Sequence, residues 1–204
     1  MTPALSPESA RITTVCIMRG SATAMERLSP YFACFKSGLI AVPINNRLKA
    51  PEIAYILKHS KAKLCFAQPE LASGCEEACC VGCPNLQRIY TTLPFFETTV
   101  SESVTLPVIH SNQIATILYT SGTTAQPKGV THTHWSLSHF GKLMCSLGLD
   151  ESDTLLPATQ LMHIAALSCA LLPGISCGGP SFCFPLLMPL DFWTASSIGD
   201  VRIS

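Results

Sequence analysis

The stretch that decides the fold runs from Ala115 to Val130 and reads ATILYTSGTTAQPKGV. Its first six residues, Ala115 to Thr120, are apolar and β-branched, which predicts a buried strand. Ser121 to Gly129 supply hydroxyls, glycines and one lysine, which predict a loop. Val130 to Thr133 resume an extended pattern, and a helix is expected from about His134. The segment therefore predicts two strands joined by a polar loop.

Upstream of this stretch, helical and extended patterns alternate. Apolar residues recur at helical spacing from Ala24 to Gly38, and Pro51 opens a second expected helix. Short strands are expected at 39–44, 63–67 and 88–91, whereas residues 1–22 show no clear period. This alternation predicts an α/β fold with a mixed, mostly parallel sheet flanked by helices, in which ligands bind at the carboxyl ends of the strands.

The helix expected from His134 carries large apolar residues on overlapping faces, which predicts that they are core residues. These are Trp135, Leu137, Phe140, Leu143, Met144 and Leu147.

Composition excludes some classes of protein. The 204 residues carry thirteen basic and thirteen acidic side chains, and the pI is near 7.0, so no electrostatic footprint for nucleic acid is expected. The longest apolar stretch, Leu161 to Ile175, is broken by Pro173 and Gly174 and is too short for a membrane span. Without a recognisable leader, the chain is expected in the cytoplasm with its eleven cysteines reduced.

Two groups of residues raise the alternative of a metal site. Cys75, Cys79, Cys80 and Cys83 fall within nine residues, a spacing that is awkward for one tetrahedral zinc site and favours a surface loop or helix. His132 and His134 would share one face of a strand, but no third ligand is evident nearby.

The loop from Thr120 to Gly129 has the composition of a polyphosphate site. Glycines allow close backbone approach, hydroxyls donate hydrogen bonds, and Lys128 adds positive charge. A Walker loop is excluded because Lys128 precedes Gly129 and an extended segment follows. By composition alone, an ordinary Ser/Thr/Gly-rich loop remains the alternative.

The string YTSGTTAQPKGV resembles the phosphate-binding signature of the adenylate-forming (AMP-binding) superfamily, written [YF][TS]SG[TS]TGxPKGV. It departs from the signature at Ala125, where the family has glycine, and alanine would be strained if the loop requires positive φ there. The resemblance covers about residues 30–180 and is to acyl-CoA synthetases of the long-chain fatty acid–CoA ligase type, hence to part of their large N-terminal domain.

The resemblance implies roles for individual residues. It implies that ATP is bound by Thr120, Ser121, Gly122, Thr123, Thr124 and Lys128. Thr124 is also implied near Mg²⁺ and Lys128 near the leaving pyrophosphate, which makes these two the candidate catalytic residues. His163 matches a histidine near the acyl pocket, although a histidine in an apolar helix is otherwise a core residue. A carboxylic acid substrate and CoA as co-substrate are implied as well, placing the chain in fatty acid metabolism.

Later motifs of the family, including its YGxTE-like and TGD segments, do not occur in the 204 residues. We therefore expect a partial AMP-binding N-terminal domain at 23–190, a poorly matched segment at 1–22 and a divergent tail at 191–204. Three interpretations stay open: a fragment that is inactive alone, a nucleotide-binding module completed by a complementary chain that carries the missing half, and a structural protein that reuses the fold.

Overall fold

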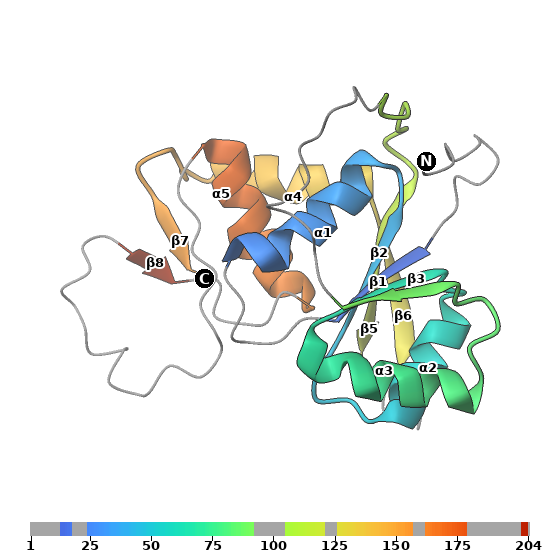
Figure 1. Ribbon diagram of the computed structural model, residues 1–204. Coiled ribbons are helices and arrows are strands. Elements are labelled where there is room, and N and C mark those ends of the chain that lie inside the picture. The colour runs from blue at the N-terminus through green and yellow to red at the C-terminus, as the bar shows by residue number, and fades with distance from the viewer. Residues whose placement is uncertain are drawn as a thin grey trace, which may run out of the picture.

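A six-stranded sheet with the order β4-β3-β1-β2-β5-β6 forms the centre of the protein (Figure 1). The computed structural model describes residues 13–17, 24–91, 105–120, 126–156, 162–178 and 201–203. The six strands are β1 (Thr13–Ile17), β2 (Ile40–Ile44), β3 (Leu64–Ala67), β4 (Arg88–Tyr90), β5 (Ile114–Thr120) and β6 (Lys128–Thr133). All neighbours pair in parallel except β5 and β6, which are antiparallel. The predicted mixed, mostly parallel sheet is confirmed.

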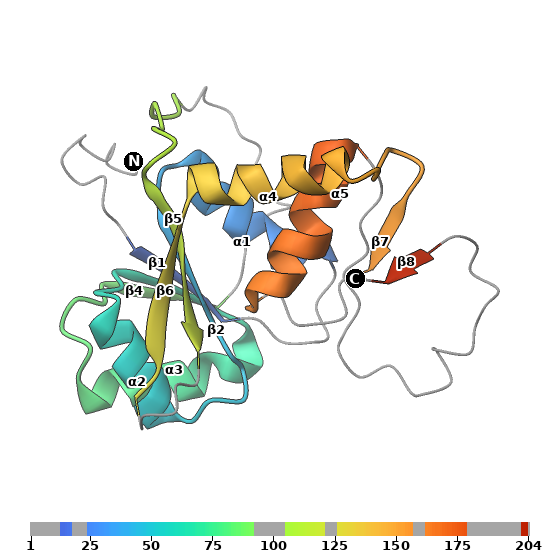
Figure 2. The same cartoon turned by 180° about the vertical axis from the view of Figure 1, so that it is seen from behind.

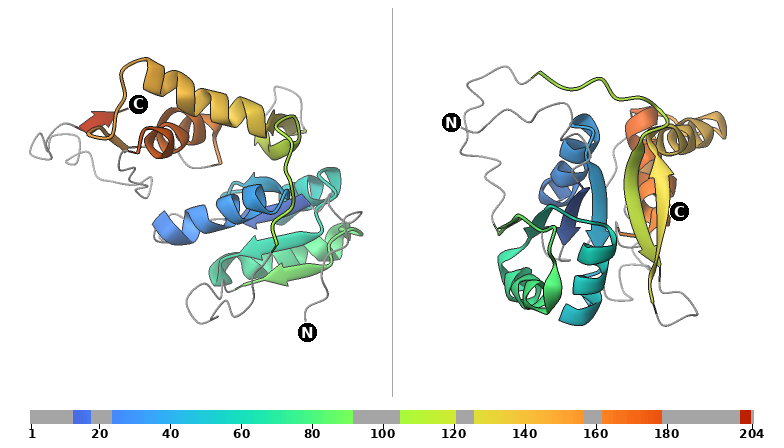
Figure 3. Two further views of the ribbon diagram at one scale, coloured as in Figure 1. Left: turned by 90° about the horizontal axis from the view of Figure 1, so that it is seen from above. Right: turned by 90° about the vertical axis from the view of Figure 1, so that its right-hand side faces the viewer.

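The helices lie on both faces of this sheet (Figures 1 and 3). They are α1 (Ala24–Lys36), α2 (Ala50–His59), α3 (Pro69–Gly82), α4 (His134–Ser146), the π-helical segment η2 (Ala166–Leu171) and α5 (Leu172–Cys177). A separate parallel pair is formed by β7 (Thr154–Leu156) and β8 (Val201–Ile203).

Residues 1–22 contain a strand that the sequence pattern did not predict. They show no clear period, but Thr13–Ile17 form β1, which pairs with β2 on one side and β3 on the other. A strand of a parallel sheet that has helices on both faces needs no polar alternation, so its sequence shows little periodicity. The signal was the run of β-branched residues at 12–15, which favours a strand.

Two apolar cores lie on opposite faces of the sheet. On one face, Val42 and Ile44 of β2 pack with the buried residues of α2, β3 and α3. On the other face, Ala41 and Ala115 pack with α1, α4 and η2. Neighbouring residues of β2 thus serve opposite cores, as the two-residue period of a strand requires.

Strand β5 is tied to the parallel part of the sheet by a buried hydroxyl. Thr116 is fully buried, and its Oγ1 donates a hydrogen bond of 2.7 Å to the carbonyl oxygen of Ala41. The same two residues are partners in the parallel pairing of β2 with β5. Because the strands are parallel, Thr120 at the end of β5 lies at the same edge as Ile44 at the end of β2.

Helix α4 begins directly where β6 ends (Figure 2). Thr133 caps it, since its Oγ1 accepts a hydrogen bond from the Ser136 N–H and the Ser136 Oγ accepts one from the Thr133 N–H. The prediction that the large residues of α4 are core residues is wrong for most of them. Leu137 is buried, but Trp135, Phe140, Leu143 and Leu147 are exposed. Only one face of α4 packs against its described neighbours. Because apolar residues occur on several faces of this helix, the sequence alone could not show which face is buried.

The cysteines also differ from the expectation of reduced, buried thiols. Cys145 in α4 and Cys177 in α5 form a disulfide that joins the ends of the two helices, while Cys80 is an exposed free thiol. Spacing in the sequence could not reveal this pairing, because it depends on how α4 and α5 pack. Separately, none of the helices in the described part of the chain has the length and apolar content needed to cross a membrane.

The disulfide predicts a measurable stability difference. It closes a loop of 32 residues, for which the chain-entropy estimate is about 3–4 kcal/mol. Replacing both Cys145 and Cys177 by alanine should lower the free energy of unfolding by this amount in urea titrations under oxidising conditions. Dithiothreitol should lower the stability of the unsubstituted chain but not that of the double variant. Equal sensitivity of both proteins to the reductant would contradict the assignment.

Candidate functional site

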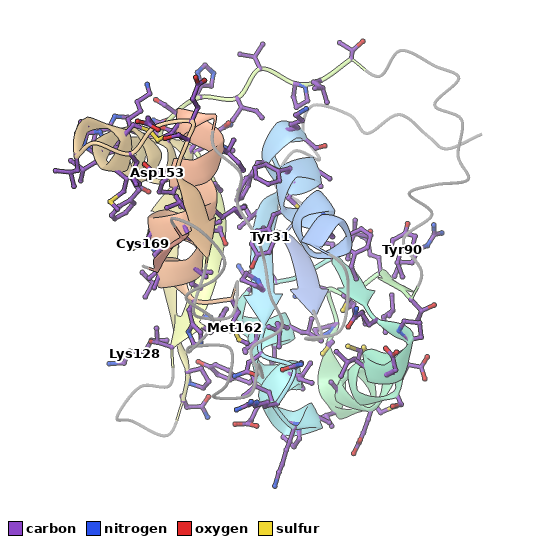
Figure 4. The ribbon with its side chains drawn as sticks, turned by 90° about the vertical axis from the view of Figure 1, so that its left-hand side faces the viewer. Tyr31, Tyr90, Lys128, Asp153, Met162 and Cys169 are labelled. Carbon is purple, nitrogen blue, oxygen red and sulfur yellow. A yellow bond between two sulfur atoms is a disulfide. The ribbon has the colours of Figure 1, made fainter. Side chains whose placement is uncertain are left out.

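The candidate phosphate loop connects β5 to β6 at the carboxyl edge of the parallel strands. Thr120 and Lys128 are the last paired residues of the antiparallel hairpin, so they face each other across the mouth of the loop. Both residues are exposed, and Figure 4 labels Lys128 at this end of the hairpin. Ser121, Gly122, Thr123, Thr124 and Ala125 lie outside the described residues. The structure therefore brings together Thr120 and Lys128, the first and last of the residues predicted to bind ATP.

The mouth of the loop is shaped by a close contact between Tyr119 and Gly129. These residues are cross-strand partners, and a Cβ on Gly129 would lie 2.9 Å from Ile117 Cγ2 and 3.3 Å from Tyr119 Cζ. Only glycine leaves room for both side chains beside the backbone. The glycine that follows Lys128 is thus explained by packing against the preceding strand.

Two residues at this mouth were missed by the sequence analysis. The Tyr119 hydroxyl lies 2.7 Å from Nδ1 of His59, in the last turn of α2, and their rings meet edge to face at 5.8 Å. Burial raises the pKa of Tyr119 to about 12, so its hydroxyl stays protonated at neutral pH. No local pattern could reveal the contact, since sixty residues separate its members.

Asn46, just after β2, adds a polar atom at the same edge. Its Oδ1 is buried and accepts no hydrogen bond among the residues that the structure describes. A buried acceptor normally has a donor. The sequence signal was the pair Asn45–Asn46 directly after an apolar strand, a position where polar residues of parallel sheets meet ligands.

His163, predicted to line an acyl pocket, lies at the start of the helical segment that leads into η2. Its side chain is exposed, and its carbonyl oxygen accepts a hydrogen bond of 3.5 Å from Leu167 N–H. It is therefore not the core histidine that an apolar helix would suggest. Figure 4 shows its neighbour Met162 toward the loop end of the hairpin that Lys128 marks.

The histidine pair is divided between two elements. His132 belongs to β6, whereas His134 is the first residue of α4 and meets the ring of Phe35 edge to face at 5.9 Å. Burial lowers the pKa of both histidines. Across the described ranges, no three His, Cys, Asp or Glu side chains gather where they could hold a metal ion.

Three residues of the cysteine cluster, Cys75, Cys79 and Cys80, lie on the helix α3, and Cys83 directly follows it. Cys75 is buried with its sulfur 3.8 Å from that of Cys65, whereas Cys80 is exposed. Burial raises the pKa of Cys79 to about 11 and also raises that of Cys83.

Comparison with known proteins identifies the family. Residues 23–198 match the AMP-binding enzyme family, and the chain belongs to that family. Its relatives are acyl-CoA ligases. The chain is 34% identical over 158 residues to 2-succinylbenzoate–CoA ligase of Bacillus licheniformis, a match that covers 71% of this chain and 29% of that protein.

Solved structures confirm the fold. The anthranilate CoA ligase AuaEII in complex with anthranoyl-AMP gives a TM-score of 0.75 at 25% identity, covering 92% of this chain and 38% of that one. The inhibitor-bound N-terminal domain of FACL13 from Mycobacterium tuberculosis gives 0.74 at 26% identity, covering 90% and 47%. The chain is thus similar to the N-terminal part of acyl-CoA ligases and spans about a third of the length of the curated relatives it matches.

The contact at Gly129 can be tested with one methyl group. Gly129→Ala should lower the free energy of unfolding by about 1–3 kcal/mol, because the added Cβ must displace Ile117 or Tyr119. Gly74→Ala is the matched control: it lies within α3 with no atom within 4 Å of the position that the added methyl group would take, and should stabilise the chain by up to about 1 kcal/mol. Equal effects of the two substitutions in urea titrations would refute the contact.

Proposed function

We propose that the chain carries the ATP phosphate-binding part of an AMP-forming acyl-CoA synthetase. In this reaction a substrate carboxylate attacks the α-phosphorus of Mg-ATP, pyrophosphate leaves, and an acyl-adenylate forms. The thiol of CoA then attacks the acyl carbon and AMP leaves. The chain supplies part of this machinery and is not expected to complete the reaction alone, because it spans about a third of its curated relatives.

One observation carries the proposal: Thr120 and Lys128 face each other at the carboxyl edge of the parallel strands. In open α/β sheets, this edge is where ligands bind. A hydroxyl can donate a hydrogen bond to a phosphate oxygen, and the ammonium group of Lys128 offsets the negative charge that builds up on the leaving pyrophosphate. The exposed position of both side chains fits a polyphosphate that arrives from solvent.

The roles of the remaining site residues are proposed from the family resemblance. Ser121, Gly122, Thr123 and Thr124 surround the phosphates in this proposal, and the Thr124 hydroxyl also lies near Mg²⁺. His163, whose side chain is exposed, borders the acyl pocket in this proposal. An aliphatic acid, and hence fatty acid metabolism, is proposed from the family resemblance alone. The cytoplasm, which supplies ATP and CoA, is the proposed compartment, and its reducing conditions would keep Cys145 and Cys177 as thiols.

A second candidate is a nucleotide-binding module that a complementary chain completes. It is favoured by exposed apolar side chains on α4 and directly after it: Trp135 of α4 is 58% exposed, and Leu147, the residue after the helix, is 70% exposed. Beside them β6 is an edge strand within the described sheet, with Val130 exposed. Exposed apolar surface and unpaired strand edges are normally covered. This candidate predicts that pyrophosphate release appears only when a chain with the rest of the fold is added.

The role of Lys128 gives the direct test of nucleotide binding. Isothermal titration of the 204-residue chain with Mg-ATP should show binding, and Lys128→Ala should raise the Kd by about 10- to 100-fold because a charge-assisted contact to phosphate is lost. Lys142→Ala is the control, since Lys142 is an exposed lysine on α4. No binding by the parent chain, or the same Kd for the two variants, would overturn the proposal and favour a structural protein.

A further inference from the structure

A hydrogen bond links α2 to the residue that precedes the candidate loop. Tyr119 is followed by Thr120, where the loop begins, and its hydroxyl lies 2.7 Å from His59 Nδ1. The hydroxyl is protonated at neutral pH, so it can donate to Nδ1 of a neutral imidazole. A group on one helix therefore contacts the hairpin at the mouth of the loop.

The imidazole of His59 is itself held in place. Tyr55, one turn earlier on α2, stacks on it with a centroid distance of 5.4 Å and an interplanar angle of 18°. The other contact is the edge-to-face approach to Tyr119 at 80°. Residues four apart on a helix share a face, so this stack orients the ring toward the sheet.

Tyr119 reaches both strands of the hairpin. It belongs to β5, and its ring lies 3.3 Å from the position that a Cβ on Gly129 of β6 would take. Gly129 directly follows Lys128. Fixing the Tyr119 ring therefore fixes the backbone on both sides of the loop mouth.

We propose that His59 and Tyr119 are positioning residues that hold Thr120 and Lys128 at the separation needed to bind a polyphosphate. This inference rests on the proposed function. Neither side chain contacts the nucleotide in the proposal; both act through the hairpin. Nothing in the family resemblance assigns a role to His59.

A purely structural role predicts a different result from a positioning role. His59 is exposed and Tyr119 is half-buried, so loss of their hydrogen bond should change global stability little. A purely structural role would require that the Tm fall together with the nucleotide affinity, whereas a positioning role requires that the affinity fall while the Tm is nearly unchanged. The two roles are thus separated by comparing the Kd for Mg-ATP with the Tm of each variant.

The experiment is a double-mutant cycle with His59→Ala and Tyr119→Phe. Each single substitution should raise the Kd for Mg-ATP by about 3- to 10-fold, the range that one neutral hydrogen bond supports. The double variant should be no weaker than the weaker single variant, because both remove the same bond. Independent, multiplicative effects would overturn the proposal.

Two matched variants serve as controls. His59→Asn keeps a polar atom at the Nδ1 position and should restore the Kd to within about 2-fold of the parent. Tyr55→Phe removes a hydroxyl on the same face of α2 but keeps the stacked ring, and should leave the Kd unchanged. A Kd for His59→Asn that equals that of His59→Ala would contradict a role for the hydrogen bond.

Amide hydrogen exchange without nucleotide gives a second readout. His59→Ala and Tyr119→Phe should speed exchange by about 3- to 10-fold at the one of the adjacent Lys128 and Gly129 amides that bonds to β5, with no change at Thr133 at the base of the hairpin. If the parent chain does not bind Mg-ATP, the proposed function fails, and this measurement still decides whether His59 and Tyr119 order the loop mouth. Unchanged exchange in both variants would overturn the inference.

Discussion

The parallel pairing of β5 with β2 is the constraint on which the candidate site depends. It brings the end of β5 to the carboxyl edge of the sheet, and the buried Thr116 hydroxyl, bonded to the Ala41 carbonyl oxygen, reinforces it at the centre. A hydroxyl removed from water is costly unless it has a partner, so this bond disfavours slippage of β5 along β2. From there the antiparallel partner β6 returns the chain with Lys128 opposite Thr120.

The packing around the hairpin explains why glycine and threonine occupy positions 129 and 133 of β6. Gly129 is small because Ile117 and Tyr119 occupy the space above it, and Thr133 ends β6 because its hydroxyl caps α4. Gly129 and Thr133 thus each fix one end of β6, the strand that carries Lys128.

Much of this arrangement could be predicted from the sequence. The alternation of patterns from Ala24 to Thr133 predicted the elements and the parallel sheet, and the loop composition with its family resemblance indicated phosphate binding. Long-range packing could not be predicted: the contact of His59 with Tyr119, the exposed face of α4 and the Cys145–Cys177 disulfide all depend on elements far apart in the chain. Strand β1 was missed for a different reason, since strands of a parallel sheet with helices on both faces need no polar alternation.

The central claim is that the connection between β5 and β6 binds the phosphates of ATP. It is tested most directly by titrating the ¹⁵N-labelled 204-residue chain with Mg-ATP and, separately, with Mg-tripolyphosphate, while following backbone amide shifts. We expect both ligands to shift the same amides, concentrated at residues 119–129, because the shared phosphates make the contact. Shifts confined to other parts of the chain, or none at saturating concentrations, would contradict the account.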